Sequence, residues 1–127
     1  MKVYTGTDIV EVSRIKNAIM TSKELFLDKV YTKQEQEYCS SKKAHMYESY
    51  AARFAVKEAV SKALGTGIGS ELSLLDVEVV NGERGKPNLV LHGKALELYN
   101  SLNIFTSDIS ISHTSENAIA FVVMIGN

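Results

Sequence analysis

The sequence predicts an α+β fold in which a mostly antiparallel sheet packs against one long central helix. Of the 127 residues, 45% are hydrophobic, which is enough for one sizeable core and predicts a single domain over residues 1–127. An alanine-rich segment with helical periodicity supplies the long helix. The strand-like segments come in pairs joined by turn residues, and strands joined in this way pair antiparallel.

The first part of the chain is expected to begin with a strand and to continue as helices. Residues 3–9 are rich in strand-favouring side chains, with Asp8 near the end of the predicted strand, and a helix is expected over about 12–20. Thr32 and Glu35 have the spacing of a capping box, in which a hydroxyl and a carboxylate bind the free N–H groups of a helix start. They predict the beginning of a short helix.

The long helix is predicted over 46–64. Ala52, Ala55 and Ala59 recur on one face, and Gly65 supplies a stop. The remaining elements are expected to be strands at 75–80 and 88–92, a helix at 94–102, and strands at 108–112 and 118–125. Turn-forming residues separate the strands of each pair, which predicts two hairpins.

The composition argues against several classes of protein. The chain carries 14 Lys and Arg residues against 15 Asp and Glu residues, a formal net charge of -1, which disfavours a nucleic-acid-binding protein but leaves room for a local basic patch. The longest apolar run, 118–125, is too short to span a bilayer. Residues 1–5 lack the apolar core of a secretory signal, and the single Cys39 has no disulfide partner. The expected location is the cytoplasm, without a membrane partner.

Asp8 is the first candidate functional residue. An acidic side chain at the end of a strand is most often a solvated turn residue. Among apolar neighbours, its carboxylate could also bind a hard cation such as Mg²⁺. The residue by itself leaves both interpretations open.

The long helix carries four further charged candidates. Glu58 and Lys62 lie one turn apart on one border of the alanine face, and Arg53 and Lys57 lie one turn apart on the opposite border. A Glu–Lys pair with this spacing can be a simple surface ion pair. A face of alanines, however, lets another backbone approach closely, as a compact site requires. The spacing therefore fits both a surface ion pair and a functional site.

The turn at 82–87 combines glycines with Lys86 and Pro87. Glycine gives backbone freedom, lysine offers a charge for a phosphate, and proline stiffens the end of the loop. The turn lacks the Gly-x-x-x-x-Gly-Lys-Ser/Thr pattern of a P-loop, and a plain hairpin turn also explains it.

Ser112, His113 and Thr114 form a polar cluster at the end of a predicted strand. Strand alternation places His113 on the face opposite Ser112. The cluster could donate hydrogen bonds to a phosphate, or His113 could be a structural residue. No Gly-x-Ser-x-Gly motif occurs, so a hydrolase triad is not supported.

Together, these residues favour phosphate chemistry. Two carboxylates, several cations and a Ser-His-Thr cluster suit Mg²⁺-assisted transfer involving a phosphate ester better than acyl or redox chemistry. Two other classes stay open at this point: a non-catalytic coenzyme- or nucleotide-binding module, and a small structural protein whose charged residues only cover its surface.

At these residues the chain resembles the holo-[acyl carrier protein] synthases, the short class of 4'-phosphopantetheinyl transferases. Residues 6–15 (GTDIVEVSRI) and 54–68 (FAVKEAVSKALGTGI) match two signatures of that family in order. The turn around Lys86 and the segment 110–114 also fall where the family has them. Many longer relatives carry Trp at the position of Phe54, and a large aromatic ring is kept here. The resemblance covers essentially the whole chain and implies the 4'-phosphopantetheinyl transferase fold.

The resemblance implies transfer of 4'-phosphopantetheine from coenzyme A to a serine of apo acyl carrier protein, with release of adenosine 3',5'-bisphosphate, in support of fatty acid biosynthesis. It implies that Asp8 and Glu58 hold Mg²⁺ against the coenzyme A pyrophosphate and that Lys62 neutralises charge at the phosphoryl group. Glu58, directly or through a water molecule, is the expected base for the serine hydroxyl.

The resemblance also implies binding residues for two partners. Coenzyme A is expected to contact Arg53, Lys62, Gly65, Lys86, Pro87, Ser112, His113 and Thr114. The acyl carrier protein is expected to meet Arg14 through an acidic helix, with Phe26 as a further apolar contact.

The quaternary structure implied by the resemblance is a homotrimer with active sites at subunit interfaces, because longer relatives carry two related halves and this chain has the length of one. One chain is expected to supply one side of each site, made of Asp8, Arg53, Glu58 and Lys62. A neighbouring chain is expected to supply the other side, made of Lys86, Pro87 and His113.

Overall fold

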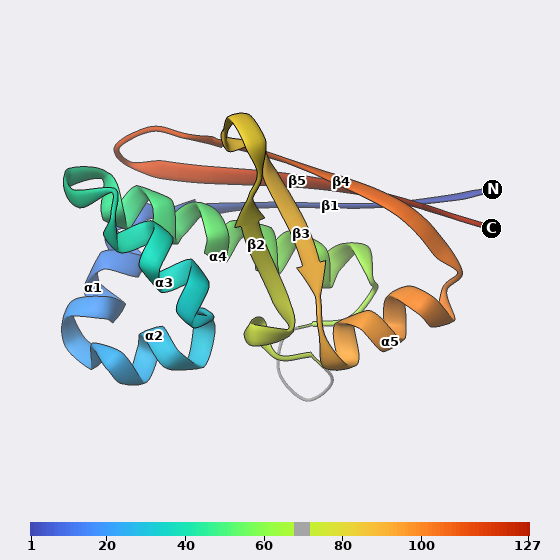
Figure 1. Ribbon diagram of the computed structural model, residues 1–127, viewed down its shortest axis with the longest axis horizontal. Coiled ribbons are helices and arrows are strands. Elements are labelled where there is room, and N and C mark those ends of the chain that lie inside the picture. Colours follow the sequence, from blue (N-terminus) through green and yellow to red (C-terminus); the bar gives the residue numbers. More distant parts are fainter. Residues whose placement is uncertain (68–71) are drawn as a thin grey trace.

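A three-stranded antiparallel sheet forms one layer of the protein. The computed structural model describes residues 1–67 and 72–127. The sheet consists of β1 (Lys2–Glu11), β4 (Ile104–His113) and β5 (Asn117–Gly126), in the order β1-β5-β4. The last strand of the chain is therefore the central one, and every second residue of β5 is buried. Figure 1 shows the two termini side by side at one end of this sheet.

The long helix α4 (Met46–Ala63) packs against this sheet through its alanine face. Gly6 of β1 marks the closest approach, because a Cβ atom there would collide with the carbonyl oxygen of Ala59. The helix ends where the sequence predicts. Gly65 has a φ of +81°, its N–H donates to Lys62, and the N–H of Thr66 donates to Ser61, which is a Schellman cap.

Three shorter helices pack around one end of α4: α1 (Val12–Ser22), α2 (Glu24–Val30) and α3 (Lys33–Ser40). The capping box predicted for α3 is confirmed. The N–H of Glu35 donates to the Thr32 hydroxyl at 3.2 Å, and the N–H of Thr32 donates to the Glu35 carboxylate at 3.0 Å. Short 3₁₀ turns lie at Lys43–His45, Leu74–Asp76 and Glu83–Gly85.

A second sheet is the predicted hairpin of β2 (Val77–Asn81) and β3 (Pro87–Leu91), whose strands pair antiparallel. The hairpin crosses α4 on the side away from β1, and its tip stands beside β4 (Figure 1). Helix α5 (Gly93–Ser101) then leads into β4. The α+β prediction with antiparallel pairing and a long central helix is confirmed.

Two elements differ from the sequence-based expectation. No helix was expected over 24–30, because α2 has only seven residues, too few to show a clear helical period. Lys23, with a φ of 48°, separates it from α1. In addition, β4 begins at Ile104 rather than at 108, because a shift in strand register between Ile104 and Thr106 interrupts the alternation of buried and exposed residues.

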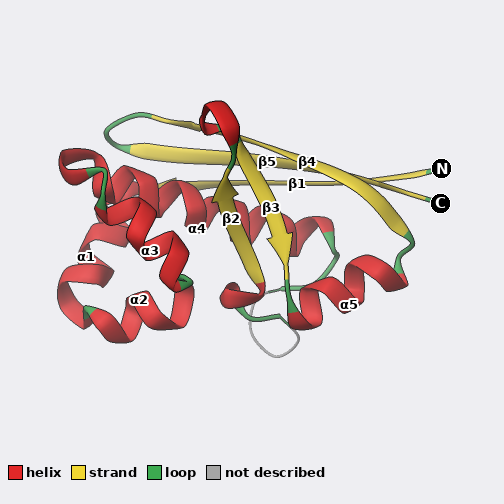
Figure 2. Ribbon diagram, viewed as in Figure 1, coloured by secondary structure: helices red, strands yellow, loops and turns green. Residues whose placement is uncertain are grey.

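One face of the three-stranded sheet has no helix over it among the described residues (Figure 2). Val3, Ile9, Ile119 and Phe121 point out from this face and are exposed, with Ile9 at 66%. We refer to these four residues as the open sheet face. Ile9 and Ile119 lie directly opposite each other on β1 and β5, so the exposed apolar surface is continuous there. No helix in the described ranges is long and apolar enough to cross a membrane.

Candidate active site

Asp8, Glu58 and Lys62 come together where β1 meets α4, and we call these three residues the carboxylate site. The Lys62 Nζ lies 3.1 Å from the Asp8 Oδ1 and donates to the Thr7 carbonyl at 2.9 Å. The strand and the helix are held together by the Gly6–Ala59 contact, two residues before Asp8 and one residue after Glu58. The close backbone approach therefore places the acid of the strand beside the helix residues.

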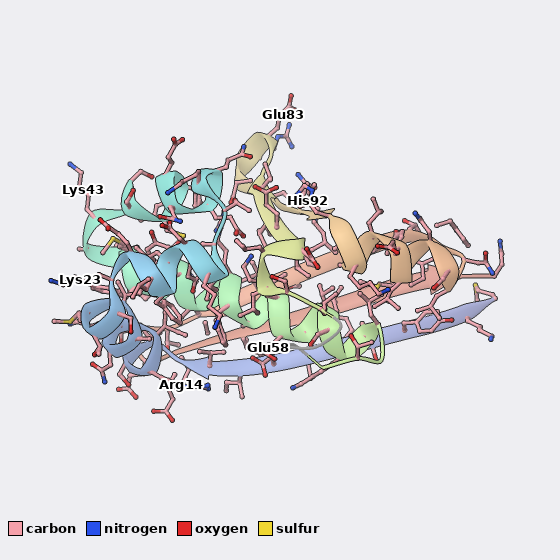
Figure 3. All side chains as sticks on the ribbon, turned by 90° about the horizontal axis from the view of Figure 1, so that it is seen from below. Arg14, Lys23, Lys43, Glu58, Glu83 and His92 are labelled. Atoms are coloured by element: carbon pink, nitrogen blue, oxygen red, sulfur yellow. The ribbon has the colours of Figure 1, made fainter. Side chains whose placement is uncertain are left out.

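The Glu58 carboxyl shares the electrostatic environment of Asp8. Burial, followed by the negative charge of Asp8, raises the pKa of Glu58, while Lys62 and Arg14 act in the opposite direction. Figure 3 shows Glu58 and Arg14 on the same side of the molecule, next to β1. Two neighbouring carboxylates repel each other unless a cation lies between or beside them. The geometry thus favours cation binding at this point.

The donor set fits Mg²⁺. Within the described part of the chain, no group of three or more His, Cys, Asp or Glu residues converges in a way that could hold a metal. Mg²⁺ is commonly held by one or two carboxylates, with water and substrate phosphates completing its octahedral shell. Asp8 and Glu58 would supply two such oxygen ligands, and both are accessible from solvent to some degree.

A second site is a pocket of about 510 Å³ between the start of α4, the tip of the β2–β3 hairpin and the end of β4. We call it the basic pocket because five of its residues are basic: Lys42, His45, Arg53, Lys86 and His113. Its remaining lining residues are Tyr38, Ser49, Ala52, Asn81, Gly85, Pro87, Ile109, Ser110 and Ile111. Such a concentration of cations suits an anionic ligand.

Arg53 is the best-fixed residue of the basic pocket. Only 4% of it is exposed, and its Nη2 donates to the side chain of Asn81 and to the carbonyl of Val79. The guanidinium lies 4.2 Å from the ring centre of Tyr38. Its Nε is buried, has no hydrogen-bond partner among the described residues and lies 4.0 Å from the Glu35 Oε2. Arg53 thus presents a firmly positioned charge at the wall of the basic pocket.

Beneath Arg53 lies a buried ion pair that the sequence did not reveal. Lys57 is fully buried, and its Nζ donates to Glu35 at 2.8 Å and also to the carbonyls of Leu74 and Val77. Burial lowers the pKa of Lys57, and Glu35 opposes that effect. The same Glu35 carboxylate accepts from the backbone N–H of Val79 at 3.0 Å. The pair therefore joins α3, α4 and the hairpin.

The structure divides the predicted residues differently from the sequence-based grouping. Arg53 was expected beside Asp8 and Glu58, but it lines the basic pocket together with Lys86 and His113 of the same chain. The physical reason is helical geometry. Arg53 and Glu58 are five residues apart, which is about 140° around a helix, so the two side chains leave α4 on different sides.

Besides Lys62, three predicted coenzyme-binding residues do not line the basic pocket. Ser112 is exposed on β4 and does not line the pocket. Ser110, two residues earlier in the same strand, does line it. The Thr114 hydroxyl accepts from the N–H groups of Glu116 and Asn117 at 3.2 and 3.1 Å, so it is engaged in the β4–β5 turn. Gly65 caps α4 just beyond Lys62 and therefore lies next to the carboxylate site.

The two predicted carrier-binding residues also differ in placement. Arg14 is exposed on α1, and its guanidinium lies 5.9 Å from the ring centre of Phe54. Phe26 is only partly exposed and packs edge-on against Tyr31, with ring centres 6.2 Å apart. The most exposed apolar residue of α2 is instead Leu25, at 82%.

The fold and the two sites define a class of protein: residues 4–122 match the model of the 4'-phosphopantetheinyl transferase superfamily, and the chain belongs to that superfamily. Within it, the chain is 49% identical over 124 residues to a holo-[acyl-carrier-protein] synthase of Ruminiclostridium cellulolyticum, covering 98% of this chain and 92% of the relative. It is 43% identical over 120 residues to the holo-[acyl-carrier-protein] synthase of a Geobacter species, covering 94% and 95%.

Solved structures agree with this assignment. The holo-[acyl-carrier-protein] synthase of Helicobacter pylori, determined in complex with coenzyme A, is 37% identical and superposes with a TM-score of 0.83 over 95% of this chain and 99% of that chain. The enzyme of Bacillus anthracis, in complex with CoA (3',5'-ADP), is 38% identical with a TM-score of 0.79 over 98% and 96%. The predicted fold of the superfamily is thereby confirmed.

Proposed function

We propose that this protein transfers 4'-phosphopantetheine from coenzyme A to a serine of apo acyl carrier protein and so acts as a holo-[acyl carrier protein] synthase in support of fatty acid biosynthesis. The observation that carries the proposal is the presence of both a carboxylate site and a basic pocket on one chain that is 49% identical to such an enzyme. A polyphosphorylated substrate needs both a cationic binding pocket and charge neutralisation at the reacting phosphate.

In the transfer, the serine oxygen attacks the phosphorus that bears the pantetheine, and the bond from that phosphorus to the leaving adenosine 3',5'-bisphosphate breaks. Asp8 and Glu58 would hold Mg²⁺, which supplies charge neutralisation at the pyrophosphate. Lys62, already 3.1 Å from Asp8, would neutralise charge that develops on the phosphoryl oxygens and the leaving group. Phosphoryl-type transfer demands mainly this kind of positioning.

Glu58 is the proposed base for the proton of the serine hydroxyl. Burial and the neighbouring Asp8 raise the pKa of its carboxyl, and a higher pKa makes a carboxylate a better proton acceptor near neutral pH. The proton passes to Glu58 directly or through a water molecule as the new bond to phosphorus forms.

The basic pocket would hold the adenosine bisphosphate part of coenzyme A. Arg53 and His113 would contact its phosphates, with Lys86 and Pro87 beside the adenosine end. Gly65, next to Lys62, would border the pyrophosphate. Ser112 and Thr114 stay in the proposed set as neighbours of His113, with Thr114 acting mainly through the turn that it stabilises.

The functional unit we propose is a homotrimer of this single domain, with each active site between two chains. The carboxylate site and the basic pocket leave α4 on different sides, so the pocket of one chain could face the carboxylates of the next. The open sheet face supports such an assembly, because large exposed apolar patches usually mark protein interfaces.

Apo acyl carrier protein is the proposed second substrate. Arg14 would meet an acidic helix of the carrier, close enough to Glu58 to bring the acceptor serine to the carboxylate site. Phe26 would act as an apolar contact, and the more exposed Leu25 offers a second one. The lone buried Cys39 suits a reducing compartment, so we place the reaction in the cytoplasm.

The test is a mass-shift assay. The protein is mixed with coenzyme A, Mg²⁺ and an apo acyl carrier protein, and the carrier is analysed by mass spectrometry. We expect the carrier to gain one phosphopantetheine group. The gain should disappear when a chelator removes the metal and when the acceptor serine of the carrier is replaced by alanine. Coenzyme A binding that is independent of Mg²⁺, without any mass shift, would instead show a non-catalytic coenzyme-binding module.

A further inference from the structure

One carboxylate beside the basic pocket, that of Glu48, bonds two histidines that lie far apart in the sequence. The Oε2 of Glu48 lies 2.9 Å from the Nδ1 of His45, and its Oε1 lies 3.0 Å from the Nδ1 of His113. Glu48 stands in the first turn of α4, His45 in the 3₁₀ turn before it, and His113 at the end of β4. Only 16% of the Glu48 side chain is exposed, so the bridge is partly shielded from water.

Both imidazole rings line the basic pocket. Because each Nδ1 is bonded to Glu48, each ring keeps its Nε2 as the one polar atom with which to reach a ligand. A carboxylate that accepts from the Nδ1 of an imidazole fixes the orientation of the ring and the tautomer in which Nδ1 carries the proton. The bonds act on the carboxyl as well: the hydrogen bond to His45, and then that to His113, lower the pKa of Glu48.

We infer that Glu48 is a positioning residue, which orients His45 and His113 so that the pair binds a phosphate group of coenzyme A in the basic pocket. The inference rests on the proposed function for the identity of the ligand. It adds His45 to the binding residues and assigns Glu48 a role in affinity. Glu48 itself touches no substrate atom.

The other charged groups around the pair make this role consistent. Lys42 precedes the 3₁₀ turn, Arg53 lies on α4 and Lys86 lies at the hairpin tip, and all three line the same pocket with Tyr38 as the remaining titratable group. These cations attract an anionic ligand to the pocket. Glu48 is the carboxylate that bonds both rings and so fixes them beside these cations.

The test compares coenzyme A binding by the wild-type protein, by Glu48→Ala and by Glu48→Gln, with calorimetry giving each dissociation constant at neutral pH. We expect Glu48→Ala to bind roughly tenfold more weakly, because both rings lose the bond that orients them. Glu48→Gln should recover part of this loss, since its amide oxygen still accepts a hydrogen bond from a ring.

The matched control is Glu97→Gln, which removes the same charge as Glu48→Gln from exposed α5 and should bind coenzyme A as the wild type does. Equal affinity of Glu48→Ala and the wild type, or an equal loss of affinity in Glu48→Ala and Glu48→Gln, would overturn the inference.

The outcome can be separated from that of the mass-shift assay, because affinity and transfer are measured independently. A protein whose coenzyme A affinity falls in Glu48→Ala and partly recovers in Glu48→Gln, but that transfers nothing, would refute the proposed function and support the role of Glu48. A wild-type protein that does not bind coenzyme A would overturn both.

Discussion

The carboxylate site and the basic pocket are built in different ways. The carboxylate site depends on one backbone contact, between Gly6 and Ala59, which brings two elements together. Its side chains are partly exposed, and Lys62 bonds both Asp8 and the Thr7 carbonyl. The basic pocket is assembled instead from the α3–α4 corner, the hairpin tip and β4.

The basic pocket is also supported by buried polar contacts. Arg53 is fixed by Asn81 and Tyr38 and rests above the buried Glu35–Lys57 pair. A buried ion pair costs desolvation free energy, but removing one partner costs more, since it leaves an uncompensated charge. The difference agrees with the division of roles that we propose: a pocket with preformed bonds for recognition, and an open pair of acids for the transfer itself.

Substitutions in the two sites should therefore change different kinetic constants. We expect Glu58→Gln and Asp8→Asn to lower kcat by about 1,000-fold, because stabilisation of the transition state is lost. The KM for coenzyme A should change only a few-fold. Thermal unfolding should be close to that of the wild type, because Asp8 and Glu58 are only partly buried and the Asp8–Lys62 ion pair is accessible to solvent.

The contrasting variant is Lys86→Ala in the basic pocket. Lys86 is exposed and pairs with Asp108 at 3.0 Å, so its loss should leave the fold intact. We expect KM for coenzyme A to rise roughly tenfold, with kcat within about twofold of the wild type. A fall in kcat with unchanged KM for Lys86→Ala, or the reverse for Glu58→Gln, would show that the two sites do not divide the work in this way.

The sequence was informative where local signals define the structure. The α4 period, the Gly65 stop and the Thr32–Glu35 box depend on residues a few positions apart, and all three were predicted. Asp8 and Glu58 are far apart in the sequence, and their association was expected from the resemblance of residues 6–15 and 54–68 to one family. The structure adds the physical cause, which is the glycine at position 6.

The parts that sequence reasoning missed depend on long-range packing. Glu35 looks like a capping residue and is one, but it also pairs with Lys57 across 22 positions, and no local pattern indicates this. The Glu48 bridge joins residues 65 positions apart. The position of Arg53 in the basic pocket agrees with the helical wheel, which separates it from Glu58 by about 140°.

A mixing experiment sharpens the comparison by asking whether the two sites belong to one chain or to two. Glu58→Gln lacks a working carboxylate site, and a double variant Lys86→Ala, His113→Ala lacks a working pocket. If each active site takes one side from each of two chains, mixed homotrimers contain some intact sites. Random assortment of equal amounts should restore roughly a quarter of the sites. Each variant alone, taken through the same dissociation and reassembly, is the control. No recovery in mixtures shown to contain hybrid trimers would contradict interfacial sites.

The smallest expected effect concerns the surface beside the carboxylate site, where Arg14 is proposed to bind the carrier. Arg14→Gln should raise KM for the acyl carrier protein roughly tenfold, because a charge-assisted contact with an acidic helix is lost. Lys16→Gln is the matched control: Lys16 is also exposed on α1, but two residues along a helix place it about 200° away. Its side chain lies over the Tyr47 ring instead.

Steady-state kinetics with each substrate varied in turn provide the measurement. Because Arg14 lowers the pKa of Glu58, its removal could also weaken metal binding, so the Mg²⁺ concentration for half-maximal rate is measured in parallel. We expect that concentration and KM for coenzyme A to change less than KM for the carrier. Equal changes in KM for coenzyme A and KM for the carrier protein would assign Arg14 to the carboxylate site rather than to the carrier-binding surface.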